Sequence, residues 1–250
     1  MELFGEGLAW LANPANWTDP RNGILLRLWE HVSLSVIALA LAVAIGLPLG
    51  LWIGHTGRGA GIVIAIANIG RAVPSVGWLG LVFPITLVIL GRGGIGFIPA
   101  VIALTALGIP PIVTNTFAGM REVDRDLIEA GRGMGMTAGQ VVRRVEVPVA
   151  LPVIMAGIRV SAVQIVATAT LASIVGGGTL GDFIIQGIDV RALERVVGAA
   201  LLVSLLAIGT ELLFSLLERL LVSPGIRART APARDEAAQL LPSEAAASGR

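Results

Sequence analysis

The stretch EHVSLSVIALALAVAIGLPLGLWIG, residues 30–54, decides the fold class, because Glu30 is its only acid and it contains no arginine. A helix of about 20 apolar residues crosses the hydrocarbon core of a membrane. Four further runs have the same character: residues 60–90, interrupted at 71–77, and residues 97–120, 149–175 and 196–222. Across the chain 55% of residues are hydrophobic and 14% are charged, against about 25% charged in soluble domains. We therefore expect an all-α integral membrane protein.

The number of spans depends on the second run, which contains Pro74. Two helices would each be too short to span comfortably, so we favour one broken helix and five spans, with six as the alternative. Arginine is concentrated between the third and fourth runs and again after the fifth. Arginine-rich loops lie on the cytoplasmic side of a membrane. The two segments fall on the same side whether the chain has five spans or six. Residues 1–29 are then an extracytoplasmic segment, residues 30–222 the membrane domain, and residues 223–250 a disordered cytoplasmic tail.

Missing residue types exclude several classes of function. The chain has no Cys, and His31 and His55 are far apart in the sequence, so we expect no metal site and no catalytic thiol. All 18 basic residues are Arg, so the lysine-containing phosphate loop of ATPases cannot occur and the chain is not expected to be an enzyme. Gly176, Gly178 and Gly181 have the spacing of a dinucleotide loop but follow a membrane run instead of a strand. We expect no cofactor, and without a basic stripe no nucleic acid partner.

One long polar stretch, MREVDRDLIEAGRGMGMTAGQVVRRVEVPVALPVIMAGIR at residues 120–159, interrupts the apolar body. Arg125 and Glu129 are four residues apart, which is a favourable pair on a helix. Closely spaced glycines follow, Thr137 is suited to cap a new helix, and Pro148 is expected to end that helix. The pattern predicts a helix, a glycine turn, a short amphipathic helix and re-entry into the membrane. Such a knob either docks a partner or is a solvated loop.

The same stretch resembles the EAA motif of bacterial ABC importer permeases, whose pattern is E-A-A-x3-G-x9-I-x-L-P. Residues 129–148 read EAGRGMGMTAGQVVRRVEVP, with the spacing intact. Gly131, Val145 and Val147 replace Ala, Ile and Leu of the pattern. Further blocks look like the branch that imports glycine betaine, choline and carnitine, and the methionine-importer permeases are similar over the same region, about residues 30–222. The blocks are residues 69–75, 123–130, 150–159 and 176–182.

This resemblance implies the five-span fold of type I ABC importers, similar to the methionine permeases, with a cytoplasmic coupling-helix loop at residues 121–148. We call residues 121–148 the motif segment. The implied partners are a cytoplasmic dimer of ABC ATPases, an extracytoplasmic substrate-binding protein, a second permease copy (identical or related) and the lipid membrane. The residues implied to couple to the ATPase are Glu129, Ala130, Gly131, Met134, Gly135, Met136, Thr137 and Pro148.

Polar residues inside the apolar runs are candidates for the transport pathway or for a subunit interface. Arg159 lies in the fourth run and Glu211 in the fifth, and the two are suited to pair. For Arg159 a structural salt bridge or snorkelling is the favoured interpretation. Arg71 either faces the pathway or lies at a dimer interface, and Gln164 either lines a polar path or hydrogen-bonds between helices. Pro74 and Ser75, beside Arg71, complete this set.

The function expected from the resemblance is the permease subunit of an importer for osmoprotectants of the glycine betaine, choline, carnitine or proline betaine type, in the bacterial plasma membrane. The alternative is a permease for methionine or another amino acid. A different class is an ion-gradient-driven carrier or a membrane scaffold. The chain has no Tyr and few aromatic residues in its runs, so it offers no obvious aromatic cage for a quaternary ammonium ligand. Selectivity would then reside in the separate binding protein.

Overall fold

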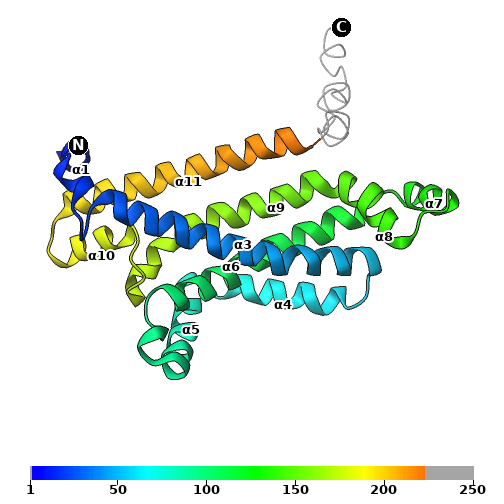
Figure 1. Ribbon diagram of the computed structural model, residues 1–250, viewed down its shortest axis with the longest axis horizontal. Coiled ribbons are helices and arrows are strands. Elements are labelled where there is room, and N and C mark those ends of the chain that lie inside the picture. Colours follow the sequence, from blue (N-terminus) through cyan, green and yellow to red (C-terminus); the bar gives the residue numbers. More distant parts are fainter. Residues whose placement is uncertain (1, 223–250) are drawn as a thin grey trace, which may run out of the picture.

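The computed structural model describes residues 2–222, which form helices and no strand (Figure 1). The 3-10 helices are η1 and η3, and η2 is a single π-helical turn. The all-α prediction is confirmed for these residues, and the predicted tail at 223–250 lies outside them. In chain order the elements are α1 (Glu2–Ala12), α2 (Ala15–Thr18), α3 (Ile24–Thr56), α4 (Ala60–Ala72), α5 (Ser75–Leu90), η1 (Gly91–Gly94), α6 (Phe97–Arg121), α7 (Arg125–Gly133), α8 (Ala138–Val141), η2 (Val142–Glu146), α9 (Val147–Thr168), η3 (Ala169–Val175), α10 (Gly181–Asp189) and α11 (Leu193–Leu221).

Five helices in the described range are long and apolar enough to cross a membrane, as the sequence predicts. They are Ile24–Thr56, Ser75–Gly94, Phe97–Arg121, Ala138–Val175 and Leu193–Leu221. The first begins at Ile24, before its predicted start at residue 30, although Arg27 lies in this added stretch. The helix tolerates this charge because Arg27 pairs with Glu30, at 2.8 Å, and with Asp182 of α10, at 3.2 Å.

The second apolar run forms two helices, α4 and α5, separated by the extended residues Val73 and Pro74. Proline has no N–H and restricts the residue before it to extended geometry, so α4 ends there. The predicted interruption at 71–77 is confirmed. The run is not the single broken span that the sequence favours. It forms a separate 13-residue helix, α4, followed by a membrane-length segment, Ser75–Gly94. Figure 1 shows α5 bending away from the line of α4.

Helix α6 is the centre of the bundle and packs against both α3 and α9. On α3 a small buried residue recurs at every fourth position facing α6, and these positions form one stripe of the helix surface. A Cβ added at Gly50 would lie 2.6 Å from the Cβ of Thr116, closer than real side chains approach. Small residues at this spacing let two helix backbones approach closely in a membrane. The stripe is Ala38, Ala42, Gly46, Gly50 and Gly54.

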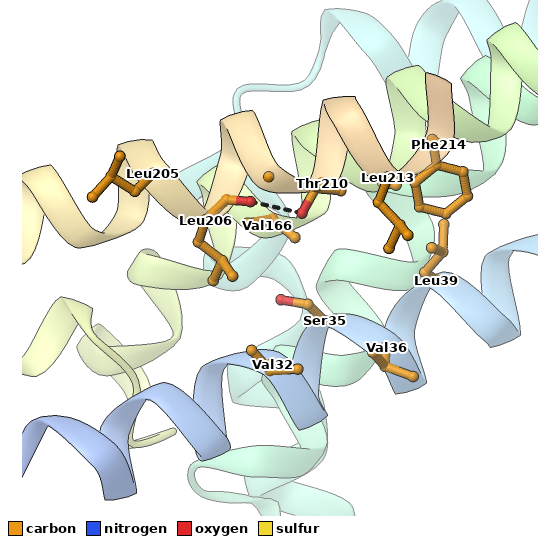
Figure 2. A pocket seen from close by; sticks show the side chains of 12 residues that line it. Val32, Ser35, Val36, Leu39, Val166, Leu205, Leu206, Thr210, Leu213 and Phe214 are labelled. Atoms are coloured by element: carbon orange, nitrogen blue, oxygen red, sulfur yellow. Dashed lines mark hydrogen bonds between the residues drawn. The ribbon is translucent and has the colours of Figure 1, made fainter. Parts of the chain in front are cut away.

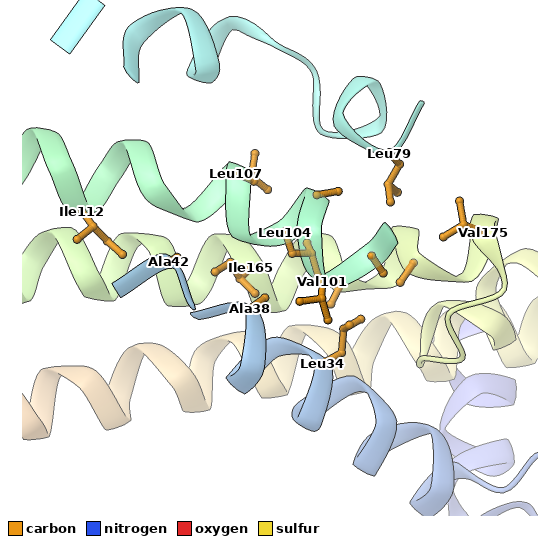
Figure 3. Close-up of a cluster of buried hydrophobic side chains, with 14 residues drawn as sticks. Leu34, Ala38, Ala42, Leu79, Val101, Leu104, Leu107, Ile112, Ile165 and Val175 are labelled. Carbon is orange, nitrogen blue, oxygen red and sulfur yellow. The ribbon is translucent and has the colours of Figure 1, made fainter. Parts of the chain in front are cut away.

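Helix α9 packs on α6 by the same means. A Cβ added at Gly157 would lie 2.6 Å from the Cβ of Asn115 and 2.9 Å from the carbonyl oxygen of Pro111. The hydroxyl of Ser161 donates to the carbonyl of Gly108 at 2.9 Å, which ties the two helices across a buried contact. Figure 3 shows the resulting cluster, in which side chains of α3, α5, α9 and η3 surround those of α6. It includes Leu34, Leu79, Leu104, Leu107, Ile165 and Val175.

Pro148 does not end a helix, contrary to the prediction. The chain stays helical from Ala138 to Val175, and Pro148 lies in the first turn of α9 directly after the π-turn η2. At this turn the N–H of Val147 donates to the carbonyl of Val142, five residues back. The wider π-turn accommodates the proline ring and its missing N–H without breaking the helix. The last part of the motif segment, from Ala138, therefore runs into α9 as one continuous helix.

Candidate functional site

The motif segment lies at the end of the bundle farthest from α1 and α10 (Figure 1). Helix α7 begins at Asp124, whose carboxylate accepts the N–H of Asp126 at 2.9 Å and so caps the helix. Val123 and Ile128 pack into an apolar cluster with side chains from the ends of α6 and α9. The segment is therefore anchored on the membrane domain by one face and free on the other.

Most of the predicted motif residues face solvent. Met134 is the most prominent, with 72% of its surface exposed. Flexible, polarisable methionine is common at protein-binding surfaces. Met136 and Pro148 are half-buried, and Gly131 is buried. The remaining predicted residues are all exposed: Glu129, Ala130, Gly135 and Thr137.

A glycine turn joins α7 to α8, as predicted. The N–H of Met136 donates to the carbonyl of Gly131 at 3.2 Å and closes the turn. Gly135 has φ of +82°, in the left-handed region that favours glycine. A Cβ added at Gly131 would lie 3.5 Å from Met136 Sδ and 3.8 Å from Val141 Cγ2, which is ordinary contact. The alanine of the motif pattern would therefore fit at Gly131.

Thr137 caps α8, as predicted. Its Oγ1 accepts the N–H of Gln140 at 3.4 Å, and Gln140 Oε1 accepts the N–H of Thr137 at 2.8 Å. This reciprocal arrangement is a capping box, which satisfies two backbone donors at the helix start. Capped helices on both sides of the turn make the motif segment a compact knob.

Sequence reasoning missed a contact that ties the motif segment to α3. Glu146 is only 3% exposed, and His55 Nδ1 lies 2.8 Å and 3.0 Å from its two carboxylate oxygens. His55 belongs to the last turn of α3. The available signal was a single acid between Val145 and Val147, because a carboxylate in apolar surroundings needs a partner. The identity of that partner is not readable from local sequence.

The predicted pair of charges inside the spans is present. Arg159 Nη1 lies 3.4 Å from Glu211 Oε1 and 3.6 Å from Glu218 Oε2. One guanidinium on α9 therefore contacts two acids that lie two turns apart on α11. The sequence indicated Glu211 but not Glu218.

Arg71 lies apart from these ion pairs. Its side chain is exposed on α4, and Nη2 donates to Oγ1 of Thr114 on α6 at 2.6 Å. Pro74 is exposed at the break between α4 and α5, and Ser75 begins α5. Gln164 is half-buried on α9. The interior candidates thus form separate sites rather than one cluster.

An apolar groove lies between α3, α9 and α11 (Figure 2). Its two hydroxyl side chains, Ser35 and Thr210, donate to the carbonyls of His31 and Leu206 in their own helices, both at 2.8 Å. The groove therefore offers mainly hydrocarbon surface to anything that enters it. Its apolar lining includes Val32, Val36, Leu39, Val166, Leu205, Leu213 and Phe214.

Comparison with known proteins identifies the family. The protein family described as binding-protein-dependent transport system inner membrane component matches residues 46–223 of this chain. This chain belongs to that family. The permease is 40% identical over 204 residues to the choline transport system permease protein OpuBB of Bacillus subtilis, covering 82% of this chain and 91% of that protein. It is also 40% identical over 206 residues to the carnitine transport permease protein OpuCB of Listeria monocytogenes, with the same coverage.

Solved structures agree with this family assignment. A chain of the inward-facing MetNI methionine ABC transporter superposes on the permease with a TM-score of 0.71 at 28% identity, covering 80% of this chain and 97% of that chain. The fold is that of type I ABC importer permeases, as the sequence predicts. Membership makes this chain a multi-pass transport permease of the cell membrane, with an ABC ATPase and a substrate-binding protein as partners.

Proposed function

We propose that this permease is the membrane subunit of an ATP-driven importer for osmoprotectants of the choline, carnitine and glycine betaine type. The observation that carries the proposal is 40% identity over nine-tenths of two relatives named for choline and carnitine transport. A third relative, 37% identical, is named for glycine betaine, carnitine and choline. Selectivity among these solutes would reside in the binding protein.

The motif segment is the part that would engage the ATPase. Its capped helices form a compact knob whose exposed face carries Glu129, Ala130 and Met134. The knob continues into α9 without a flexible loop, so a force on it would reach the membrane domain. Closure of the ATPase dimer on ATP would draw two such knobs together and turn the pathway outward, as in alternating access by rigid-body motion.

The pathway would form against a second permease copy, identical or related. The support is Arg71 of α4, whose exposed guanidinium donates to Thr114 of the span α6. A charge exposed to hydrocarbon is costly, so a second subunit or a water-filled path would cover it. Pro74, Ser75 and Gln164 belong to the same proposal. The ion pairs of Arg159 favour a structural role for that residue.

Import of methionine or another amino acid is the second candidate. It is favoured by the similarity to MetNI at 28% identity over almost all of the MetNI chain. The higher identity to osmoprotectant permeases ranks it second.

Recovery of the partner ATPase with the tagged permease from mild detergent tests the coupling role. Gly135→Glu places a charge on the exposed turn and forces a residue with a Cβ into φ of +82°. Gly5→Glu is the matched control, because it adds the same side chain on the exposed face of α1, where an added Cβ meets nothing within 4 Å. We expect the ATPase with the wild type and with Gly5→Glu, and its loss with Gly135→Glu.

Two results would contradict this. Failure to recover an ATPase with the wild type, under conditions that keep other importers intact, would count against the importer itself. Equal recovery with all three forms would place the docking surface elsewhere. Uptake of labelled choline, carnitine, glycine betaine and methionine by cells carrying the whole system then tests the solute class. Uptake of methionine alone would replace the first candidate with the second.

A further inference from the structure

The junction between the motif segment and the membrane domain contains one buried acid. Glu146 is the last residue of the π-turn η2, and its carboxylate is bonded through both oxygens to His55 Nδ1. A buried carboxylate without a partner is strongly destabilising. The position of Glu146 therefore depends on the end of α3.

Helix α3 is a firm anchor for this contact. Its stripe of small residues reaches Gly54, where an added Cβ would lie 2.5 Å from the Cβ of Met120 on α6. The helix ends just beyond His55, at Gly57 with φ of +68°. His55 is thus held in place by the packing of α3 on α6.

The π-turn gives the contact a mechanical consequence. A π-turn holds one residue more than the equivalent α-helical turn and is frequent at functional sites. Each residue of an α-helix turns the chain by about 100°. Conversion of η2 to α-helix would therefore rotate α8 and α7 by about that angle relative to α9. The contact with His55 holds the last residue of this turn, at the point where η2 meets α9.

We propose that His55 and Glu146 are positioning residues for coupling: their contact holds η2 in the π register and so sets the orientation in which α7 and α8 meet the ATPase. The proposal rests on the coupling role proposed above for the motif segment. In this arrangement neither residue touches the solute, and Glu146 is too buried to contact the ATPase. The pair acts through the exposed residues of the knob.

Transport per ATP hydrolysed, in liposomes carrying permease, ATPase and binding protein, is the first readout. We expect Glu146→Leu and His55→Phe each to lower it about fivefold or more, the lower range of measured couplings between sites. Glu146→Gln keeps a hydrogen-bonding group toward His55 and should retain most of the coupling. Thr56→Ala is the matched control, because the Thr56 hydroxyl bonds only within this end of α3, to the carbonyl of Trp52 and the N–H of Arg58.

The double variant separates a direct contact from two independent effects. If the two residues act through one contact, His55→Phe with Glu146→Leu should be no worse than either change alone. Should Glu146→Leu not elute as a folded protein, His55→Phe and Glu146→Gln carry the test. Effects that add, or transport per ATP at the wild-type level in the single variants, would overturn the proposal.

The distance between two spin labels gives a second readout, which would not change if the pair only stabilised the fold. The chain has no native Cys, and Gly133 and Gly61 are exposed positions where an added Cβ meets nothing within 4 Å. With cysteines at these two positions, we expect one distance distribution in the wild-type background and a second or broadened one with Glu146→Leu. An unchanged distribution with folded Glu146→Leu would contradict positioning through the π-turn. Absence of the ATPase from the wild type would instead overturn the proposed function.

Discussion

Arg159 of α9 lies 3.4 Å from Glu211 of α11, and the same guanidinium lies 3.6 Å from Glu218. Few of the residues of α11 are buried, and much of its length is exposed apolar surface. Polar contacts therefore carry more of its attachment than they do for α6, which is enclosed by close helix packing. Charges within membrane helices are stable where they pair in this way.

Replacing Arg159 by Met should lower the thermal stability of the purified permease more than replacing Glu211 by Gln. The first change leaves two carboxylates without their cation, whereas the second leaves Glu218 in place. We expect a loss on the order of 1–2 kcal/mol for Arg159→Met and less than half of that for Glu211→Gln. Melting in detergent, followed by tryptophan fluorescence, measures both. Equal melting of the two variants and the wild type would show that the ion pairs do not hold α11.

Gly131→Ala should stabilise α7. The added methyl group meets Met136, Val145 and Val141 at 3.5 to 3.8 Å, so it packs without displacing them. Alanine also loses less chain entropy than glycine in a helix, and together these effects should give about 0.5–1 kcal/mol. Hydrogen exchange of the α7 amides reports the gain. Gly133→Ala is the control in the same helix. Its Cβ would have nothing within 4 Å, so it shows the entropic stabilisation without the packing contribution. Faster exchange in Gly131→Ala would refute the geometry of the turn.

Gly157→Ala should have the opposite effect on the bundle. Its Cβ would lie 2.6 Å from a side-chain carbon of Asn115 and 2.9 Å from a backbone oxygen of α6, so α9 must move away from α6. Overpacking of this kind costs about 1–3 kcal/mol. The melting temperature should fall. Gly209→Ala on α11, where the added Cβ meets nothing within 4 Å, should melt at or slightly above the wild-type temperature, because alanine loses less chain entropy than glycine in a helix. A permease that tolerates Gly157→Ala fully would argue against this helix contact.

Thr137→Ala should loosen α8, because the N–H of Gln140 loses its capping acceptor, the hydroxyl of Thr137. Loss of an N-cap costs about 1 kcal/mol. Thr137→Ser keeps the hydroxyl and is the control. Hydrogen exchange at residues 138–141 should quicken for the alanine variant and stay near wild type for the serine variant. The capping box is contradicted if the two variants exchange alike.

The turn between α2 and α3 should loosen only in acid. The carboxylate of Asp19 accepts the N–H groups of Arg21, at 2.8 Å, and Asn22, at 3.2 Å, and these backbone hydrogen bonds lower the pKa of Asp19 below its ordinary value. Since the folded pKa lies below the unfolded one, the stabilisation is present above the unfolded value and disappears as the pH falls through the folded value. Protection of these two amides, corrected for intrinsic exchange, should hold at neutral pH and fall below about pH 4. Asp19→Asn should show no such step.

Local features of the motif segment were predictable because neighbouring residues determine them. The glycine turn and the Thr137 cap depend on backbone and side-chain preferences within four or five residues. The Arg159–Glu211 pairing was predictable for a different reason, since a charge in hydrocarbon needs a partner and the spans offer few. The helix-ending role predicted for Pro148 was wrong, because a π-turn, which local propensity does not indicate, accommodates the proline.

The sequence by itself determined that this is an α-helical membrane protein with a polar motif segment between its third and fourth apolar runs, because run length, charge placement and capping are read along the chain. It favoured five spans over six, and the structure has five membrane-length helices in the described range. Only the tertiary structure decided that α6 is the centre, that His55 meets Glu146, and that Glu218 joins Glu211 at Arg159. These contacts join residues distant in sequence. They exist because small residues on α3 and α9 let both helices approach α6, and that approach fixes which distant side chains can meet.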